Sequence, residues 1–228
     1  MPDSTEPPAL AIRVVETASV RDVDVARVKA AFAENYREAN LAYLEKSLGK
    51  LAYLAMAETE DGTLAGFALG EMRIVDLPRL PGTAVRLAGL CCVSMAFRRQ
   101  HLFGKLEVAA ISARDVGQHE RLLSAGRMAH PGSFRGMASN PTAVPRSGVP
   151  LTPWQKEVGI AVAEAYGTAV FDPETFVCHG TGVPIGFPVI DLQTTEEEWE
   201  VFKPVDRLKG DSLLGIAWAP TAPEGWLE

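Results

Sequence analysis

Two adjacent arginines, Arg98 and Arg99, follow an apolar stretch that ends at residues 93–95, and a helix-forming segment begins at Lys105. A turn from a strand into a helix start offers free backbone N–H groups, and the helix dipole adds partial positive charge. A phosphate or pyrophosphate needs both. The spacing therefore predicts an anion-binding turn. The alternative is a solvated helix start that simply carries three cations.

The turn resembles the acyl-CoA pyrophosphate turn of GNAT-type N-acyltransferases. Their central strand ends in a pattern close to Val-x-Pro-x-aromatic-Arg-Arg/Gly-x-Gly-hydrophobic-Gly/Leu-x-x-Leu. The residues of this chain that fit the pattern are Val93, Phe97, Arg98, Arg99, Leu102 and Leu106. The resemblance covers residues 10–115 and fades after them. It implies an α/β fold with a GNAT-like mixed central sheet flanked by helices, and with an elaborated Pro/Gly-rich C-terminal part.

The resemblance also implies which residues bind acetyl-CoA or another acyl-CoA. Val93 would contact the pantetheine arm through its backbone, and the turn would hold the phosphates. The implied set is Val93, Arg98, Arg99, Gln100, His101, Leu102, Phe103, Gly104 and Lys105.

Two positions depart from the pattern. Met95 stands where proline is usual, and His101 stands where the first glycine is expected. Glycine there lets the backbone approach the phosphates and relaxes the restriction on φ. Because the Cβ of His101 narrows that approach, Gly104 is an alternative glycine under a shifted register.

Acyl transfer to an amine needs a base for the ammonium and an acid for the leaving thiolate. By resemblance the acid is Tyr166, at the end of a predicted helix, although a tyrosine there can also simply pack the helix end. Glu71, on the second arm of a predicted hairpin, is one candidate base, and a surface glutamate is its alternative. His179, in a glycine-rich segment, is another, and a turn histidine is its alternative.

Other polar residues suggest further hypotheses. His130 and Arg135 lie in a proline-rich stretch and are candidates for lining a substrate entrance. A hydrolase built on His179 and Ser212 requires these two side chains to lie within hydrogen-bond distance. The chain has no Gly-x-Ser-x-Gly nucleophile motif. Its scattered histidines and adjacent cysteines lack the spacing of a metal site, so no metal is expected.

The first half of the chain is predicted to place strands and helices around the turn. Strands are expected at residues 11–15, 51–58, 63–75 and 86–95. Helices are expected at residues 22–36, at 40–47 and from 105 to about 113. Residues 60–62 are predicted to form a hairpin turn, and residues 77–82, with two prolines, a loop. This order is that of the first half of the GNAT fold.

The second half is less regular. Residues 130–153 contain five prolines and three glycines, which favours a long loop. A helix is predicted at residues 153–166, with Thr152 as its N-cap and proline at its first position. Short strands are expected at 176–179, 188–192 and 213–218. Residues 194–202 are predicted to form an acidic helix with a capping box of Thr195 and Glu198.

The composition is that of an ordinary acidic globular protein of 228 residues, with 47% apolar residues and a net charge of −7. The negative charge argues against a nucleic-acid partner. Three cysteines without framework spacing suggest a reducing compartment. The N-terminus does not resemble a signal peptide, and no apolar run reaches the roughly 20 residues of a membrane helix. We therefore expect a cytoplasmic protein without a membrane partner.

The expected organisation is a disordered tail at residues 1–9 and a single domain at 10–228. Residues 10–115 would be its CoA-binding half and residues 116–228 a divergent half. Four apolar residues are expected to be exposed and make a homodimer a further expectation: Trp199, Phe202, Trp218 and Trp226.

The predicted function is transfer of an acyl group, most simply acetyl from acetyl-CoA, to the amine of a small molecule. The alternatives are a GNAT-like binding or scaffold protein that has lost catalysis, and an enzyme that uses a different acyl thioester.

Overall fold

The computed structural model describes residues 9–114, 117, 119–190 and 192–228. The tail expected at residues 1–9 therefore lies, except for Ala9, outside the described residues. Within the described residues, no helix is long and apolar enough to cross a membrane.

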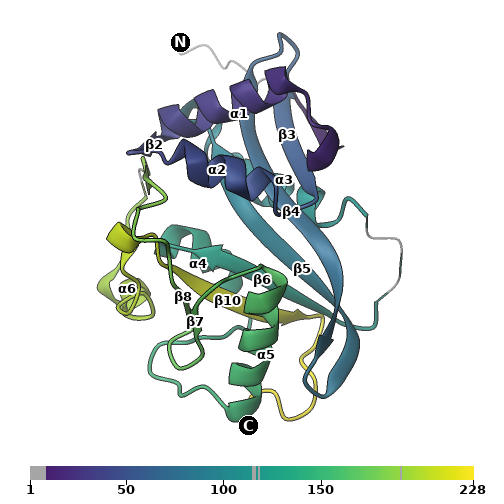
Figure 1. Ribbon diagram of the computed structural model, residues 1–228, viewed down its shortest axis with the longest axis vertical. Helices are drawn as coiled ribbons and strands as arrows, with labels where there is room; N and C mark the ends of the chain where they lie inside the picture. The colour runs from purple at the N-terminus through teal and green to yellow at the C-terminus, as the bar shows by residue number, and fades with distance from the viewer. Residues whose placement is uncertain (1–8, 115–116, 118, 191) are drawn as a thin grey trace, which may run out of the picture.

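An eight-stranded mixed sheet forms the centre of the molecule (Figure 1), in the order β1-β3-β4-β5-β6-β10-β8-β7. Neighbouring strands are antiparallel except for β5 and β6, which are parallel. The strands are β1 (Leu10–Glu16), β3 (Tyr53–Thr59), β4 (Leu64–Leu77), β5 (Leu80–Val93), β6 (Leu122–Met128), β7 (Phe171–Asp172), β8 (Val177–Cys178) and β10 (Ser212–Ala219). A separate pair joins β2 (Tyr36–Arg37) to β9 (Phe187–Pro188).

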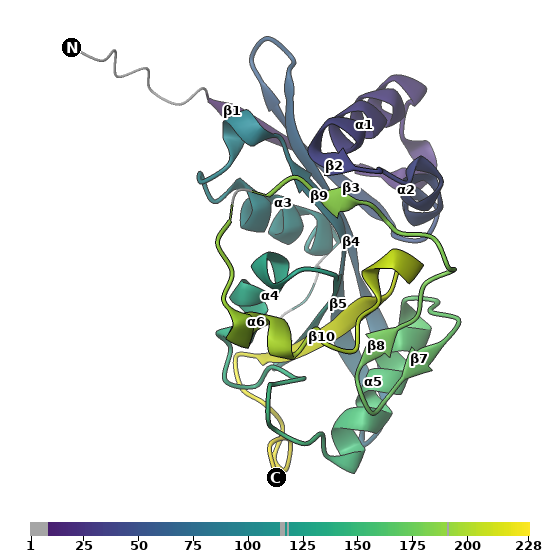
Figure 2. The same ribbon diagram turned by 90° about the vertical axis from the view of Figure 1, so that its left-hand side faces the viewer.

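Helices cover both faces of this sheet. One face carries α1 (Asp22–Asn35), α2 (Leu41–Leu48) and α5 (Pro153–Ala165), and the other carries α3 (Leu102–Ile111) and α4 (Pro131–Ala138), as Figure 2 shows. The short α6 (Glu196–Glu200) follows later in the chain. The α/β architecture with a mixed central sheet flanked by helices is confirmed.

Each face has its own apolar core. Val28 and Phe32 of α1 pack with Val158 and Val162 of α5 over one face of the sheet. On the other face, the helical spacing of Leu102, Leu106 and Ala110 turns three small or branched side chains of α3 onto the alanines of β3 and β4. This close packing holds α3, and with it the preceding turn, against the end of β5.

The predicted N-terminal caps of two helices, α5 and α6, are present in the structure. Thr152 caps α5 and forms a capping box with Gln155, and Thr195 and Glu198 form the predicted box at the start of α6. In each box two backbone N–H groups gain acceptors from side chains only three residues away. These helix starts are therefore confirmed.

Several predicted boundaries are wrong. Residues 77–82 are not a loop, since β4 reaches Leu77 and β5 begins at Leu80 after a turn in which Arg79 has φ 68°. Proline is tolerated this close to the start of a strand. The central strand ends at Val93, because Met95–Phe97 form a 3-10 turn. Helix α3 begins at Leu102 instead of residue 105.

The second half also departs from expectation. Residues 130–153 contain helix α4 and are not wholly a loop, and the expected strand at 188–192 is reduced to Phe187–Pro188. Strand β6 has no predicted counterpart. Its sequence LLSAGRM has weak strand preference, so its form depends on pairing with β5 and β10.

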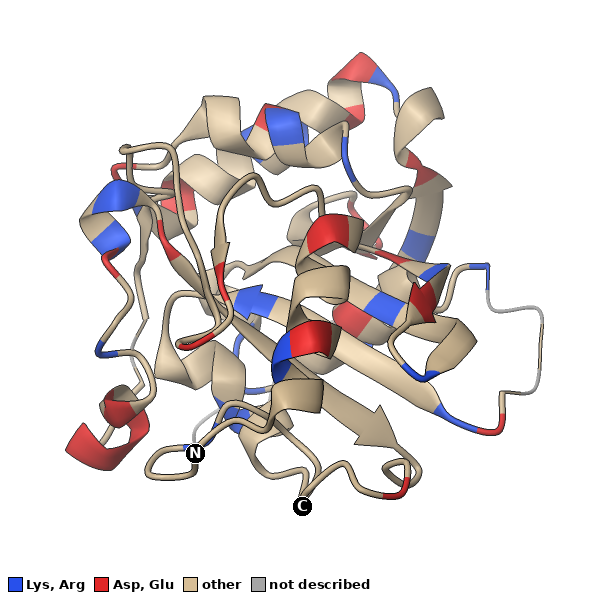
Figure 3. Cartoon of the chain, turned by 60° about the horizontal axis from the view of Figure 1, so that its bottom comes forward, with Lys and Arg blue, Asp and Glu red and all other residues tan. Residues whose placement is uncertain are grey.

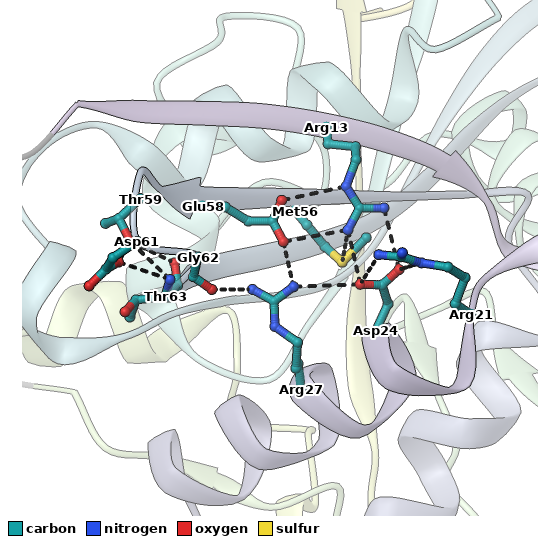
Figure 4. Close-up of polar contacts among 10 residues, drawn as sticks. All are labelled: Arg13, Arg21, Asp24, Arg27, Met56, Glu58, Thr59, Asp61, Gly62 and Thr63. Atoms are coloured by element: carbon teal, nitrogen blue, oxygen red, sulfur yellow. Dashed lines mark hydrogen bonds and ion pairs between the residues drawn. The ribbon is translucent and has the colours of Figure 1, made fainter.

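A charged cluster fastens the first strand to the first helix (Figure 4). Arg13 of β1 and Arg21 both bond to Asp24, which is buried in α1, and Arg27 bonds to Glu58 of β3. Hydrogen bonding from Arg21 and Arg13 lowers the pKa of Asp24 to about 2, against the effect of its burial. This network fastens β1, α1 and β3 to one another at the edge of the sheet.

Candidate functional site

Strands β5 and β6 pair for part of their length and then part. Their register runs from Ala84 opposite Leu122 to Ala88 opposite Gly126. Beyond that point β5 continues to Val93 and β6 to Met128, and no further pairing joins them within the described residues. We call this opening, between residues 89–93 and 127–128, the strand fork.

A β-bulge lies where the fork opens. Ala68 of β4 faces Cys91 and Gly70 faces Ala88, so Gly89 and Leu90 together stand opposite Leu69. A Cβ on Gly89 would lie 2.3 Å from a methyl carbon of Leu51 and 3.0 Å from the Cβ and carbonyl oxygen of Leu69, so a larger residue would force Leu51 to shift. The extra residue leaves backbone groups unpaired at this point.

The extra residue of the bulge also shifts the alternation of side chains along β5, which decides the core that each later residue enters. After it, Cys92 lies in the core under α1, whereas Cys91 and Val93 lie in the core under α3. Cys91 and Cys92, although adjacent, are thus both buried in the cores on opposite faces of the sheet. Burial raises the pKa of both thiols, that of Cys92 to about 12.

Backbone groups of β5 face the fork. Ser94 donates its N–H to Ala65 of β4 at 2.9 Å. Because antiparallel strands bond on alternate residues, Cys92 also faces β4, and Cys91 and Val93 turn their amides and carbonyls toward β6. The Val93 carbonyl accepts from Nε of Arg98 at 3.0 Å. The Cys91 groups and the Val93 N–H remain directed at the fork.

The turn after β5 contains two residues in the left-handed region. Arg99 has φ 64°, and His101, the N-cap of α3, has φ 57°. The position where the GNAT pattern has glycine is thus a position whose backbone favours glycine. Gly104 lies inside α3, and no atom would lie within 4 Å of a Cβ there. The left-handed conformation therefore belongs to position 101 and not to 104.

The start of α3 supplies hydrogen-bond donors. The first amide bonded along the helix is that of Lys105, to the His101 carbonyl, so the amides of residues 102–104 precede the helical ladder. Arg99, His101, Phe103, Gly104 and Lys105 are exposed and Gln100 is half-buried. The Leu102 side chain is buried in the α3 core, so only its backbone can face a ligand.

The Arg98 side chain turns back into the protein. Besides the Val93 carbonyl, it binds the side-chain oxygen of Asn35 at 3.0 Å and the carbonyl of Val189. All three guanidinium nitrogens are thereby bonded to protein acceptors. Arg98 fastens the end of β5 to the end of α1 and to the segment after β9. Its side chain therefore points into the protein, and not outward as expected of a phosphate ligand.

Tyr166 lies at the mouth of the fork on the α5 face. It caps α5, and its hydroxyl oxygen is 2.9 Å from the Ala88 carbonyl and 2.8 Å from the Ala125 carbonyl. Burial raises the pKa of the hydroxyl well above its ordinary value. The residue therefore packs the helix end, as one interpretation expects, and also places its hydroxyl between the two parting strands.

Glu107 lies on the opposite face, and sequence reasoning missed it. It is half-buried in α3 and makes no hydrogen bond or ion pair within the described part of the chain. Burial raises its pKa to about 7. Cys91 contacts the Phe103 carbonyl, one turn before Glu107, and the charge of Glu107 adds to the effect of burial in raising the pKa of the Cys91 thiol. A glutamate one turn after Phe103 looks like an ordinary exposed helix residue in sequence.

Glu71 is buried, so its interpretation as a surface glutamate is wrong. One carboxylate oxygen accepts from the Ala52 N–H at 3.2 Å, and the other pairs with Arg73. Arg73 in turn donates to the carbonyls of Lys50 and Ala165. Glu71 and Arg73 therefore connect the ends of α2 and α5 on the same face as Tyr166.

His179 is paired with an acid that the sequence did not single out. Its Nδ1 lies 3.2 Å from Oδ2 of Asp211, and the other oxygen of Asp211 accepts from the Gly180 N–H at 2.8 Å. Ser212 is buried, and its hydroxyl accepts from Arg127 at 3.1 Å. No hydrogen bond joins His179 to Ser212 within the described residues, so the contact that the hydrolase hypothesis requires is not formed there.

His130 and Arg135 hold the C-terminal segment in place. His130 caps α4 through the Gly132 N–H and packs edge-on against Trp199, with ring centroids 5.1 Å apart. Arg135 pairs with Glu198 of α6. These contacts account for both residues without a substrate entrance.

Charged residues are interspersed. Lys and Arg lie among Asp and Glu over the part of the chain seen in Figure 3, whereas the charged residues of α6 are all acidic. No group of three or more His, Cys, Asp or Glu side chains among the described residues could hold a metal ion.

No family model matches this chain, and no curated protein matches it either. Solved structures do. A GNAT family N-acetyltransferase from Escherichia coli in complex with CoA matches 58% of this chain and 69% of its own, with 15% identity and a TM-score of 0.41. A Brucella melitensis GNAT acetyltransferase in complex with acetyl-CoA matches 55% of this chain and 80% of its own, with 13% identity and a TM-score of 0.38.

The GCN5-related glucosamine N-acetyltransferase region of a fungal multi-domain β-N-acetylglucosaminidase matches 53% of this chain, with 15% identity and a TM-score of 0.40. The match spans only 14% of that longer protein. These three solved proteins are described as GNAT or GCN5-related N-acetyltransferases.

Proposed function

We propose that this chain is a divergent GNAT-type enzyme that transfers an acyl group, most simply acetyl, from acyl-CoA to the amine of a small molecule. The observation that carries the proposal is the strand fork. A parallel strand pair parts at a β-bulge, a helix start with free amides follows the longer strand, and two ionisable groups flank the opening.

The donor side of the fork suits an acyl-CoA. The unpaired groups of Cys91 and the Val93 N–H can bond to the pantetheine amides as a neighbouring strand would. The amides at the start of α3 suit the pyrophosphate, with Lys105 adding positive charge beside them. Arg98 contributes by holding the end of β5 in position.

The chemistry follows from the same geometry. The amine attacks the thioester carbonyl, and the C–S bond breaks as the amide C–N bond forms. Backbone N–H groups at the bulge stabilise the negative charge on the carbonyl oxygen. Tyr166 and Glu107 flank the fork and are the groups that can donate a proton to the leaving thiolate. His179, half-exposed and oriented by Asp211, is the candidate base, because Glu71 has both oxygens bound.

The first test is binding. Acetyl-CoA at about 100 times its Kd should add about 2.7 kcal/mol to the free energy of unfolding, which a thermal shift detects. Reversal of the exposed cation in Lys105→Glu should weaken binding about tenfold, whereas Lys203→Glu, an exposed cation after α6, should leave it unchanged. The proposal fails if millimolar acetyl-CoA produces no shift in the wild-type protein.

One observation favours a second candidate, a GNAT-like binding or scaffold protein. His101 carries a Cβ at the left-handed position where glycine is expected, and Arg98 has no nitrogen free for a phosphate. Stabilisation by acetyl-CoA without release of CoA thiol in the presence of a broad amine panel would support this alternative.

A further inference from the structure

The α5 face of the strand fork, on which the acceptor amine would bind, carries positive charge. Arg127 directly follows Gly126, the last residue of β6 that pairs with β5. It shares a face with Leu123 and Ala125, the face covered by α5, since alternate strand residues point the same way. The Tyr166 hydroxyl contacts the Ala125 carbonyl at 2.8 Å. Arg127 is therefore half-buried beside the point where the thioester would lie.

Arg127 has donors to spare. Its Nε donates to the Ser212 hydroxyl at 3.1 Å, and the guanidinium also hydrogen-bonds the Cys178 thiol. Arg127 makes no ion pair within the described residues, which leaves further N–H donors for an anion. The two terminal nitrogens of a guanidinium match the two oxygens of a carboxylate or phosphate.

A second cation lies close by. Lys50, after the end of α2, donates to the Gly167 carbonyl at 3.1 Å and so spans the ends of α2 and α5. Burial, followed by the charges of Arg127 and Lys46, lowers its pKa. Within the described chain Lys50 has no carboxylate partner either.

The acids near these cations on the α5 face are already engaged, and Glu107, unpaired among the described residues, lies in α3 on the opposite face. Glu71 pairs with Arg73, and Asp211 accepts from Gly180 and contacts His179. A partly buried cation such as Arg127 is normally paired, and the exposed Lys50 adds a second positive charge near it. An anionic ligand would neutralise both charges.

We propose that the acceptor amine carries a carboxylate or phosphate in the same small molecule, and that Arg127 and Lys50 bind this oxyanion beside the strand fork. The inference rests on the proposed acyl transfer and specifies its acceptor. The oxyanion holds the molecule on the α5 face, with its amine directed at the fork.

The test measures release of the CoA thiol by the full-length protein at saturating acetyl-CoA. It compares amines that carry an anionic group with neutral amines of matched structure. One arm pairs the common L-amino acids with their amides, and the other pairs 2-aminoethyl phosphate with 2-aminoethanol. We expect at least one anionic amine to exceed its neutral partner about 30-fold in kcat/KM, the scale of a charge-assisted pair of hydrogen bonds. The arm that responds identifies a carboxylate or a phosphate.

Variants locate the effect. Arg127→Gln should reduce the preference for the anionic amine to about threefold or less, and Lys203→Gln should preserve it. Lys50→Gln, at an exposed residue, should lower the preference even if Arg127→Gln fails to fold. A preference that survives in Lys50→Gln and in folded Arg127→Gln overturns the inference.

The wild-type results separate the two proposals. No thermal shift with acetyl-CoA overturns the proposed function itself. A shift together with equal or better use of the neutral amines overturns only the oxyanion site. A shift without acylation of any amine in either arm overturns the inference and the acceptor half of the proposed function.

Discussion

His101 shows how a single residue can carry a backbone cost at the proposed site. An L-residue in the left-handed region brings its Cβ close to the following carbonyl, which costs about 1–2 kcal/mol, and glycine avoids this contact. The exposed His101 side chain makes no hydrogen bond within the described residues that would offset the cost. Position 101 therefore has a backbone conformation that favours glycine but carries histidine.

His101→Gly should raise the free energy of unfolding by about 1 kcal/mol. Urea denaturation measures this, with Val108→Gly as the matched control in the same helix. Val108 is exposed and helical, so glycine there should lower stability by about 0.5 kcal/mol. A loss of stability in His101→Gly would contradict the strain argument.

At the scale of elements, the end of β5 is held by one side chain. Arg98 joins β5, the last residue of α1 and the segment after β9, and Val189 also donates its N–H to the Asn35 carbonyl at 2.8 Å. Hydrogen bonds from a charged group are each stronger than neutral ones. The turn that precedes α3 therefore depends on segments that are far apart in sequence.

Arg98→Ala should lower the free energy of unfolding by about 2–3 kcal/mol, because three partly buried acceptors lose a charged donor. Hydrogen exchange should accelerate most at Val189 and around residues 93–98. Lys105→Ala, at an exposed residue of α3, is the control and should change stability by less than about 0.5 kcal/mol. Equal effects of the two substitutions would show that Arg98 does not fasten these elements.

The stability of the whole molecule should depend on pH through groups with shifted pKa. Folding raises the pKa of Glu107 from 4.5 to about 7, so the native state binds more protons than the unfolded state between these values. Its contribution is therefore complete below about pH 4.5 and is lost as pH rises through 7. Asp24 acts oppositely, because its lowered pKa makes its contribution present above pH 3.8 and lost as pH falls through about 2.

Between pH 5 and pH 8, Glu107 should lower the free energy of unfolding by about 3 kcal/mol. Glu107→Gln should remove this dependence and raise stability at pH 8, as measured by urea denaturation at both values. Glu164→Gln, at an exposed glutamate of α5, is the control and should keep the wild-type profile. An unchanged profile in Glu107→Gln would mean that the carboxyl is not desolvated in the folded protein.

Much of the architecture could be predicted because its signals are local. Residues within a few positions of each other specify the strand-to-helix turn and the capped starts of α5 and α6. The same is true of the order of strands and helices before and after the turn. Strand β6 could not be predicted, because its residues become a strand by pairing with β5 and β10. The bulge at Gly89 likewise has no local signature beyond a glycine.

By itself, the sequence determined the turn, the glycine-like position at 101 and the order of the first elements, since these depend on chain geometry over a few residues. Only the tertiary structure decided what the polar side chains do. It turned Arg98 inward to Val189, set Tyr166 against Ala88, and brought Arg127 to Ser212, contacts that join residues 91, 78 and 85 positions apart. Such contacts depend on which strands lie side by side, and spacing along the chain does not encode that directly.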